Sequence, residues 1–304
     1  MIRIIADSTC DLSKEIIKQY GIKVISSKVV IDGKVLNDYD YDGDTLNEFY
    51  NNLDTMKEAP GYQPPASNNY LEAIEEGVFN GVTEFIIFIP SSQQIDDFPK
   101  VVSDALKDFE ESNKVPGIKV KMVNTLNVSQ GFGYTVLKAA KMLKKGSSYE
   151  EIIESCEANK TKIKDLMAVP DVDFLYKTGN VTKAGARATK MLGITPVLKL
   201  GTTGKATLAS KMVGEDKVAQ CFANEFKHQA DIENSDFVII GYSTDEGRAL
   251  AVKNMLEKEG RYRGEVHVMQ MRPAFGAHMG KRAVTIYFLG KHSSIALFDI
   301  FRFH

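Results

Sequence analysis

The chain has 304 residues, of which 43% are hydrophobic and 26% charged, and its 38 basic residues nearly balance its 40 acidic ones. This composition is typical of a globular protein with a substantial core, and a net charge of −2 excludes the strong positive field with which proteins collect nucleic acid. The three cysteines, Cys10, Cys156 and Cys221, are widely spaced and lie in no CxxC or Cys/His cluster, so neither a disulfide framework nor a zinc site is indicated. No apolar run is long enough to cross a bilayer, and we expect a cytoplasmic protein.

In the first half of the chain, predicted strands alternate with predicted helices. Strands are expected at residues 2–5, 23–31, 85–89 and 120–123, and helices at 12–20, 45–53, 98–109, 129–144, 149–166 and from 67 onward. Residues 60–65 contain three prolines and are expected to be rigid and non-helical. A strand, a polar junction and a helix recur three times, which predicts a parallel α/β sheet with right-handed crossovers.

The second half has a different pattern. Strands are expected at 166–169, 195–200, 206–211, 237–241, 265–270 and 283–288, and helices at 174–178, 184–192, 215–229 and 246–259. Residues 195–211 form a predicted hairpin around the turn 201–204. We therefore expect a parallel α/β domain over residues 1–165 and a smaller α+β domain over residues 166–304, with a shared cleft between two lobes.

Polar side chains follow the predicted strands at four junctions. These are Asp7-Ser8-Thr9, Ser91-Ser92, Asn124-Thr125 and Ser243-Thr244. The first three follow strands of one parallel sheet, and ligands bind at the carboxyl edge of such a sheet. Their hydroxyls and free backbone N–H groups can hold a carboxylate or a phosphate. The alternative is that each hydroxyl only caps the helix that follows it.

His278 lies between Gly276 and Gly280, which predicts a loop with unusual backbone freedom. A histidine in such a loop can donate a hydrogen bond to an anion, although a lone histidine is more often a surface residue. The other histidines have no metal-ligand partners at useful spacing.

Several enzyme and cation-binding classes are poorly supported. The chain has no GxSxG, no Walker A sequence and no GxGxxG after the first strand, so hydrolase chemistry and nucleotide binding are not indicated. The acidic run Asp38, Asp40, Asp42 and Asp44 lacks the glycine and glutamate of an EF-hand, and we expect a solvated loop there, with Asp44 capping a helix.

Several blocks, taken in order, resemble the DegV family of bacterial fatty-acid-binding proteins up to about Lys291. The blocks are Ile5–Leu12, Gln63-Pro64-Pro65, Ser91-Ser92, Val123-Asn124-Thr125, Ser129–Gly133, Val169–Leu175, Ile194–Val197 and His278-Met279-Gly280. Each block is weak alone, and their shared order is fairly specific.

The resemblance implies a two-lobed DegV-like fold, known as the EDD fold, with a long-chain fatty acid in an apolar tunnel between the lobes. Hydroxyls at strand ends would hold its carboxylate, and the protein would be a non-catalytic carrier without a cofactor. The residues that the resemblance assigns to the ligand are Ser8, Thr9, Gly61, Tyr62, Gln63, Ser91, Ser92, Asn124, Thr125, Gly131 and His278. Some family members present the carboxylate to a separate fatty acid kinase, and a carrier of lipids can also contact a membrane transiently.

The chain departs from the family pattern at positions that bear on the kinase. Gly61 replaces a threonine and Asn180 replaces an arginine, while Asp96 and Asp97 add negative charge after the paired serines. These changes predict a poor partner for an acyl-phosphate-forming kinase. The apolar tail over residues 294–304 extends beyond the usual family end and is expected to cover an apolar surface.

Two other classes of function stay open at this point. One is an enzyme or binding protein that acts on a small anionic ligand at an edge formed by Asp7, Ser8, Ser92 and His278. The other is an interaction protein with a closed cleft and no ligand.

Overall fold

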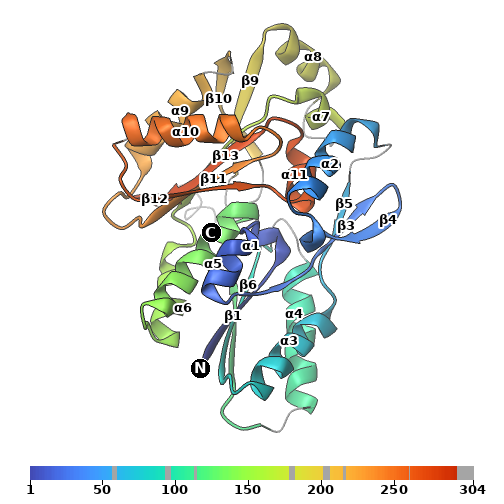
Figure 1. Ribbon diagram of the computed structural model, residues 1–304, viewed down its shortest axis with the longest axis vertical. Coiled ribbons are helices and arrows are strands. Elements are labelled where there is room, and N and C mark those ends of the chain that lie inside the picture. Colours follow the sequence, from blue (N-terminus) through green and yellow to red (C-terminus); the bar gives the residue numbers. More distant parts are fainter. Residues whose placement is uncertain are drawn as a thin grey trace, which may run out of the picture.

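The computed structural model describes residues 1–56, 60–92, 97–112, 115–177, 182–200, 206–214, 217–259 and 261–292. Its strands form three sheets (Figure 1). The first is a four-stranded parallel sheet in the order β2-β1-β6-β7, built from β1 (Ile2–Asp7), β2 (Lys23–Ile25), β6 (Glu84–Ile89) and β7 (Lys119–Asn124). This parallel pairing confirms the sheet predicted for the first half. The apolar runs of β1 and β6 are buried, as expected for strands that are covered on both faces.

The second sheet has six strands and is mostly antiparallel. Its order is β10-β9-β8-β13-β11-β12, from β8 (Ile163–Ala168), β9 (Ile194–Leu200), β10 (Ala206–Val213), β11 (Phe237–Tyr242), β12 (Glu265–Gln270) and β13 (Val284–Leu289). Only β11 and β12 pair in parallel among these strands. The expected antiparallel pairing of the hairpin strands is therefore confirmed, while its turn lies outside the described residues.

The third sheet is small and antiparallel, in the order β4-β3-β5, and it was not predicted. It contains β3 (Lys28–Ile31), β4 (Lys34–Asn37) and β5 (Gly61–Gln63). The prediction of one strand over 23–31 is wrong, because the chain breaks at Ser26-Ser27 and passes from the parallel sheet to this one. The Ser27 amide and hydroxyl bond to side chains at the end of β1, which fixes the break.

The helices cover the faces of the two large sheets. They are α1 (Lys14–Tyr20), α2 (Asp44–Asn52), α3 (Ser67–Phe79), α4 (Asp97–Ser112), α5 (Ser129–Lys144), α6 (Tyr149–Asn159), α7 (Val172–Lys177), α8 (Lys183–Met191), α9 (Lys217–Gln229), α10 (Glu246–Lys258) and α11 (Pro273–Met279), with short 3-10 turns η1 (Ser8–Cys10), η2 (Asp38–Asp40) and η3 (Leu53–Thr55). The helix predicted over 149–166 ends at Asn159, because Ile163 and Leu166 are needed as buried residues of β8. Helix α2 starts at Asp44 itself, with Gly43 at the N-cap position.

Helix α5 lies between the two large sheets and joins them. One hydrophobic cluster contains Ile86 of the parallel sheet, Phe132 and Leu137 of α5, and Ile239 and Tyr287 of the six-stranded sheet. Helices α3 and α4 cover the other face of the parallel sheet, while α9 and α10 cover the outer face of the six-stranded sheet (Figure 1). The six-stranded sheet already begins at Ile163, slightly before the predicted division at residue 165, and the division into two domains stays a prediction.

Candidate functional site

The end of β1 is a hydrogen-bonded network around one oxygen of Asp7, while the second oxygen, Oδ2, is buried without a partner among the described residues. One carboxylate oxygen of Asp7 accepts from the Thr9 amide at 2.8 Å, from the Thr9 hydroxyl and from the Ser27 hydroxyl at 3.0 Å. The Ser8 hydroxyl accepts from the Ser27 amide at 3.1 Å. Burial raises the pKa of Asp7 to about 6. The predicted hydroxyls Ser8 and Thr9 are therefore engaged with the protein itself, and the neighbouring Asp7 carboxylate is unsuited to an anion.

The end of β6 is different. The Ser91 side chain is fully buried, and its hydroxyl has no hydrogen-bond partner among the described residues. The Ser91 amide donates to the Asn127 carbonyl at 2.8 Å, which fixes the backbone. Half-buried Ser92 accepts a bond from the Asn124 side-chain amide at 2.6 Å. Ser91 therefore keeps a donor that none of the described residues uses and that a ligand can accept.

Thr125 and Gly131 have structural roles. The Thr125 hydroxyl donates to the Ile89 carbonyl at 3.0 Å, so it closes the neighbouring strand end. A Cβ added to Gly131 would meet the Tyr287 ring at 3.0 Å. The absence of a side chain at Gly131 therefore lets α5 approach β13.

The β5 segment contributes an aromatic side chain. Tyr62 is half-buried, stacks on Phe98 with ring centroids 6.1 Å apart, and lies 3.4 Å from the Ser27 hydroxyl. Burial raises the pKa of the Tyr62 phenol well above its usual value. Gly61 and Gln63 are exposed on the same strand, so among these three only Tyr62 reaches the strand ends.

His278 lies in the last turn of α11 and not in a loop, which corrects the prediction from its flanking glycines. His278 is exposed to solvent, and desolvation by the protein around it lowers the pKa of the imidazole below its usual value. Asp97 is the exposed first residue of α4, while Asp96, Asn180 and residues 294–304 lie outside the described residues.

Sequence reasoning missed a buried charged cluster beside this edge. Asp38, expected in a solvated loop, is fully buried, as are Asp11 and Arg272. The Asp38 carboxylate accepts from the Ala274 amide at 2.9 Å, and Asp11 accepts from the Arg272 amide at 2.9 Å. Burial raises the pKa of both carboxyl groups, to about 7 for Asp11. Because these contacts join residues more than 230 positions apart, no local pattern announces them.

An apolar wall lies beside α11, on the inner face of the six-stranded sheet. It consists of Met167, Val169, Val172, Leu175, Ala186, Met271, Met279 and Ala283, with half-buried Leu198, Leu200 and Phe275 packed against them. The wall runs from α11 across β8 to β9 and is continuous with the helix that carries His278. These residues form a buried apolar cluster around the helix that carries His278.

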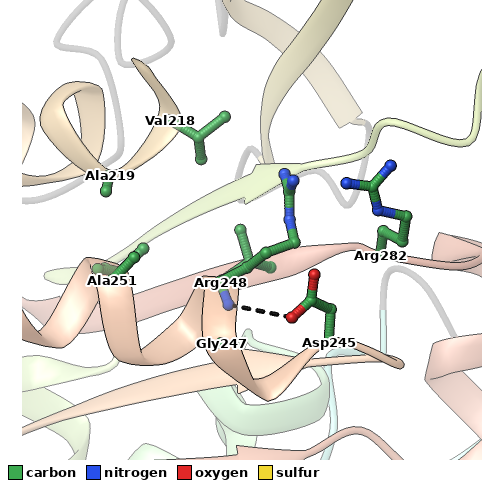
Figure 2. A pocket seen from close by; sticks show the side chains of 9 residues that line it. Val218, Ala219, Asp245, Gly247, Arg248, Ala251 and Arg282 are labelled. Carbon is green, nitrogen blue, oxygen red and sulfur yellow. Dashed lines mark hydrogen bonds between the residues drawn. The ribbon is translucent and has the colours of Figure 1, made fainter. Parts of the chain in front are cut away.

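A polar pocket of about 290 Å³ lies on the opposite, outer face of this sheet (Figure 2). Arg248 and Arg282 extend into it, and Asp245 caps α10 by accepting from the Arg248 amide at 3.4 Å. Its apolar lining includes Val218 of α9 and Val252 of α10, which pack on the outer face. This pocket therefore lies apart from the predicted ligand residues.

The described residues lack two further kinds of feature, a metal-binding cluster and a membrane-spanning helix. Their histidine, cysteine, aspartate and glutamate side chains form no group of three or more that could hold a metal ion. None of their helices combines the length and the apolarity that a bilayer crossing requires.

Relatives of known sequence match almost the whole chain. A DegV domain-containing protein of Clostridium acetobutylicum is 25% identical over 293 residues, which cover 96% of this chain and 99% of the relative. A DegV domain-containing protein of Staphylococcus aureus is 25% identical over 296 residues, covering 95% and 98%.

Solved structures share the fold. A DegV family protein of Thermus thermophilus, described as binding fatty acid, superposes with a TM-score of 0.79 at 22% identity and covers 95% of this chain and 99% of its own. A DegV family protein of Eubacterium eligens, loaded with heptadecanoic acid, gives 0.78 at 18% identity, with 96% and 100% covered. The family model described as "Uncharacterised protein, DegV family" matches residues 1–291. The chain therefore belongs to the DegV family.

Proposed function

We propose that this protein is a cytoplasmic, non-catalytic carrier that binds one long-chain fatty acid. The observation that carries the proposal is the buried Ser91 hydroxyl, which lacks a partner among the described residues at the carboxyl edge of the parallel sheet. Leaving such a donor unsatisfied costs about 1–3 kcal/mol, and a ligand carboxylate would remove that cost. Proteins of the same fold are described as loaded with heptadecanoic acid or as binding stearic acid, which supports this ligand class.

The acyl chain would lie along the apolar wall beside α11. Burying a sixteen-carbon chain removes roughly 400 Å² of apolar surface from water, at about 25 cal/mol per Å², which makes this the dominant favourable contribution to binding. The Ser91 hydroxyl and the His278 imidazole would orient the carboxylate, since each hydrogen bond contributes only about 1 kcal/mol net. Asp7, Ser8 and Thr9 would support the site without touching the ligand.

Lipid extraction tests this proposal directly. We expect a long-chain fatty acid to co-purify with the protein from bacteria, at close to one mole per mole by mass spectrometry. Delipidated protein should take up added palmitate, with decanol as a matched control that lacks the carboxylate and the long chain. Less than a tenth of a mole of any acyl species, together with no uptake of palmitate, would contradict the proposal.

We further propose that the protein is a poor partner for a fatty acid kinase. Exposed Gly61 offers no hydroxyl at the position of the family threonine, and the exposed Asp97 carboxylate at the start of α4 adds negative charge. The replacement of the family arginine by Asn180 adds to this argument. A coupled assay with a kinase from the same organism should show slow acyl phosphate formation from the loaded protein. Turnover equal to that of an arginine-bearing relative would contradict this proposal.

Transient contact with a membrane is proposed through the surface of α8. Met191 and Leu192 are 88% and 64% exposed, and Lys183, Arg187 and Lys190 lie on the same helix. Apolar side chains flanked by cations fit an anionic lipid surface. Sedimentation with phosphatidylglycerol vesicles should show binding that Met191→Asp abolishes, while phosphatidylcholine vesicles serve as the control.

A further inference from the structure

Helix α11 has only seven residues, so it depends on its contacts for stability. Three side chains from the first half of the chain hold its start. Asp11 accepts from the Arg272 amide at 2.9 Å, Asp38 accepts from the Ala274 amide at 2.9 Å, and the Tyr50 hydroxyl donates to the Met271 carbonyl at 2.9 Å. The two carboxylates also face the positive end of the helix dipole.

The packing around this contact leaves little freedom. Asp38 is 0% exposed, and Arg272, which donates to the Leu12 carbonyl at 2.9 Å, is 4% exposed. A Cβ at Gly276 would come within 1.8 Å of the Tyr50 hydroxyl, so only glycine permits this approach of α2 to α11. The start of α11 is therefore fixed relative to the carboxyl edge of the parallel sheet.

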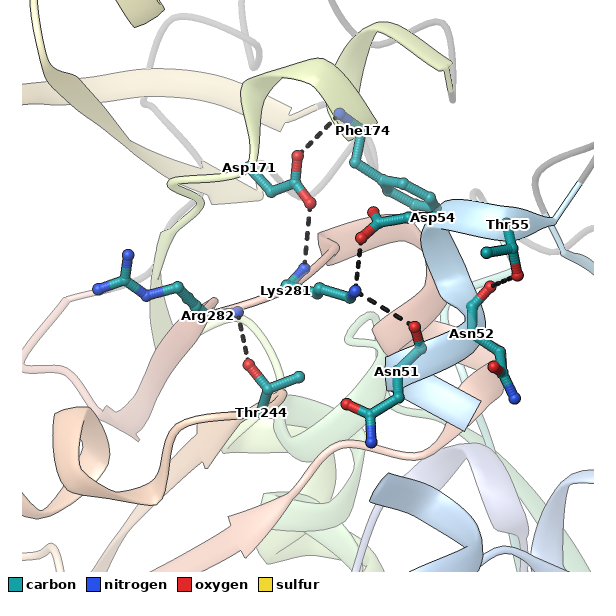
Figure 3. Close-up of polar contacts among 9 residues, drawn as sticks. All are labelled: Asn51, Asn52, Asp54, Thr55, Asp171, Phe174, Thr244, Lys281 and Arg282. Carbon is teal, nitrogen blue, oxygen red and sulfur yellow. Dashed lines mark hydrogen bonds and ion pairs between the residues drawn. The ribbon is translucent and has the colours of Figure 1, made fainter. Parts of the chain in front are cut away.

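The chain after α11 is tied to the same part of the molecule (Figure 3). The Lys281 ammonium lies 2.5 Å from the Asp54 carboxylate of η3 and 3.4 Å from the Asn51 carbonyl at the end of α2. The Lys281 amide lies 3.4 Å from the Asp171 carboxylate, which also accepts from the Phe174 amide of α7 at 3.1 Å. The ion pair between Lys281 and Asp54 is partly exposed to solvent and therefore weak. The buried carboxylates of Asp11 and Asp38 at the start of α11 therefore contribute most to the placement of this helix.

The contacts at the start of α11 also affect the position of His278. It lies four residues after Ala274, one helical turn along α11, so a tilt of the helix start moves the imidazole directly. We propose that Asp38, assisted by Asp11, is a positioning residue that sets His278 for the ligand carboxylate across the two halves of the molecule. This inference rests on the proposed function for the role of His278, and on the described contacts for the role of Asp38.

A double-mutant cycle in the full-length protein tests this inference. Palmitate affinity is measured for the wild type, Asp38→Ala, His278→Ala and the double variant. We expect each single change to weaken binding about tenfold, and the double change also about tenfold, because both remove the same interaction. Asp38→Asn, which keeps an acceptor for the Ala274 amide, should recover affinity to within about threefold of the wild type. A double variant weakened about a hundredfold would show independent effects and overturn the inference.

A second readout covers a failure of Asp38→Ala to fold. The imidazole resonances of His278 are followed by NMR in Asp38→Leu, which removes the acceptor for the Ala274 amide while keeping the side-chain volume, and in the control Asp40→Ala, which changes an exposed carboxylate of the same turn. We expect the His278 resonances to shift in the first variant and to stay in place in the second. Unchanged resonances in Asp38→Leu would show that Asp38 is merely structural and overturn the inference. If wild-type protein binds no fatty acid, the proposed function fails, while the NMR comparison still decides whether Asp38 positions His278.

Discussion

The ends of β1 and β6 lie side by side in the parallel sheet, and both carry hydroxyl side chains, yet they use them differently. At β1, the side chains of Asp7, Ser8 and Thr9 bond to one another or to Ser27. At β6, the Ser91 hydroxyl is buried and has no partner among the described residues. A hydroxyl at a strand end therefore indicates a ligand site only when no neighbouring group of the protein already forms a hydrogen bond with it.

The largest effect is expected from the charged cluster that follows β1. Replacing Arg272 by Ala leaves buried Asp11 and Asp38 without their neighbouring cation and removes the contact with the Tyr39 ring. The free energy of unfolding should fall by about 3–5 kcal/mol, as when one partner of a buried ionic group is removed. Urea unfolding measures this, with exposed Arg187→Ala of α8 as the control. A loss of less than about 1 kcal/mol would mean that this charged cluster does not stabilise the fold.

The same cluster predicts that stability depends on pH. Burial raises the pKa of Asp7 to about 6 and that of Asp11 to about 7, so the folded protein binds more protons than the unfolded chain between about pH 4 and 7. Stability from these groups is therefore present at low pH and lost as the pH rises through 6 and 7. The free energy of unfolding should be roughly 4 kcal/mol larger at pH 5 than at pH 8. Asp7→Asn should flatten this slope, and equal stability at both pH values would contradict the account.

A smaller effect separates the roles of the two strand ends. Ser27→Ala removes the hydroxyl that donates to Asp7 at 3.0 Å, and it should lower the free energy of unfolding by about 1–2 kcal/mol. Palmitate affinity should change less than twofold, because this hydroxyl serves the fold. Fluorescent fatty acid displacement and urea unfolding measure the two quantities. Weakened binding without lost stability would reverse the assignment of the two ends.

The smallest change in stability is expected at β6. Ser91→Ala removes a buried hydroxyl that no described residue accepts and that water satisfies when the ligand is absent, so the unfolding free energy of the ligand-free protein should stay within about 0.5 kcal/mol. Palmitate affinity should nevertheless fall about tenfold or more, as expected for a hydrogen bond to a charged group. Ser92→Ala is the matched control, since that hydroxyl already accepts from Asn124. Destabilised protein with normal affinity would mean that Ser91 only caps the chain.

The sequence supports prediction of the parallel sheet because β6 is apolar at five consecutive positions and its neighbours end at polar junctions. The helix prediction fails at residues 160–166, where a helical sequence pattern continues into β8, the strand that pairs with β13. The antiparallel third sheet was missed because β4 and β5 have only four and three residues. Short strands of this kind depend on their partners more than on their own sequence.

The candidate site was predictable only in part. Ser91 and Thr125 are both hydroxyl residues at strand ends, and only the contact of Thr125 with the Ile89 carbonyl separates them. Asp38 was expected in a solvated loop, and it is buried with Arg272 because residues distant in the chain enclose them. Sequence patterns therefore indicate which groups reach an edge, while three-dimensional contacts decide which of them are available.

The position of the ligand carboxylate tests the central claim most directly. A crystal structure of the protein loaded with palmitate would show it. We expect a carboxylate oxygen within about 2.6–3.0 Å of the Ser91 hydroxyl, with the hydrocarbon chain along Met167, Leu198 and Phe275. A carboxylate bound instead to Ser8 or Thr9 at the end of β1, with Ser91 still unpartnered, would contradict it.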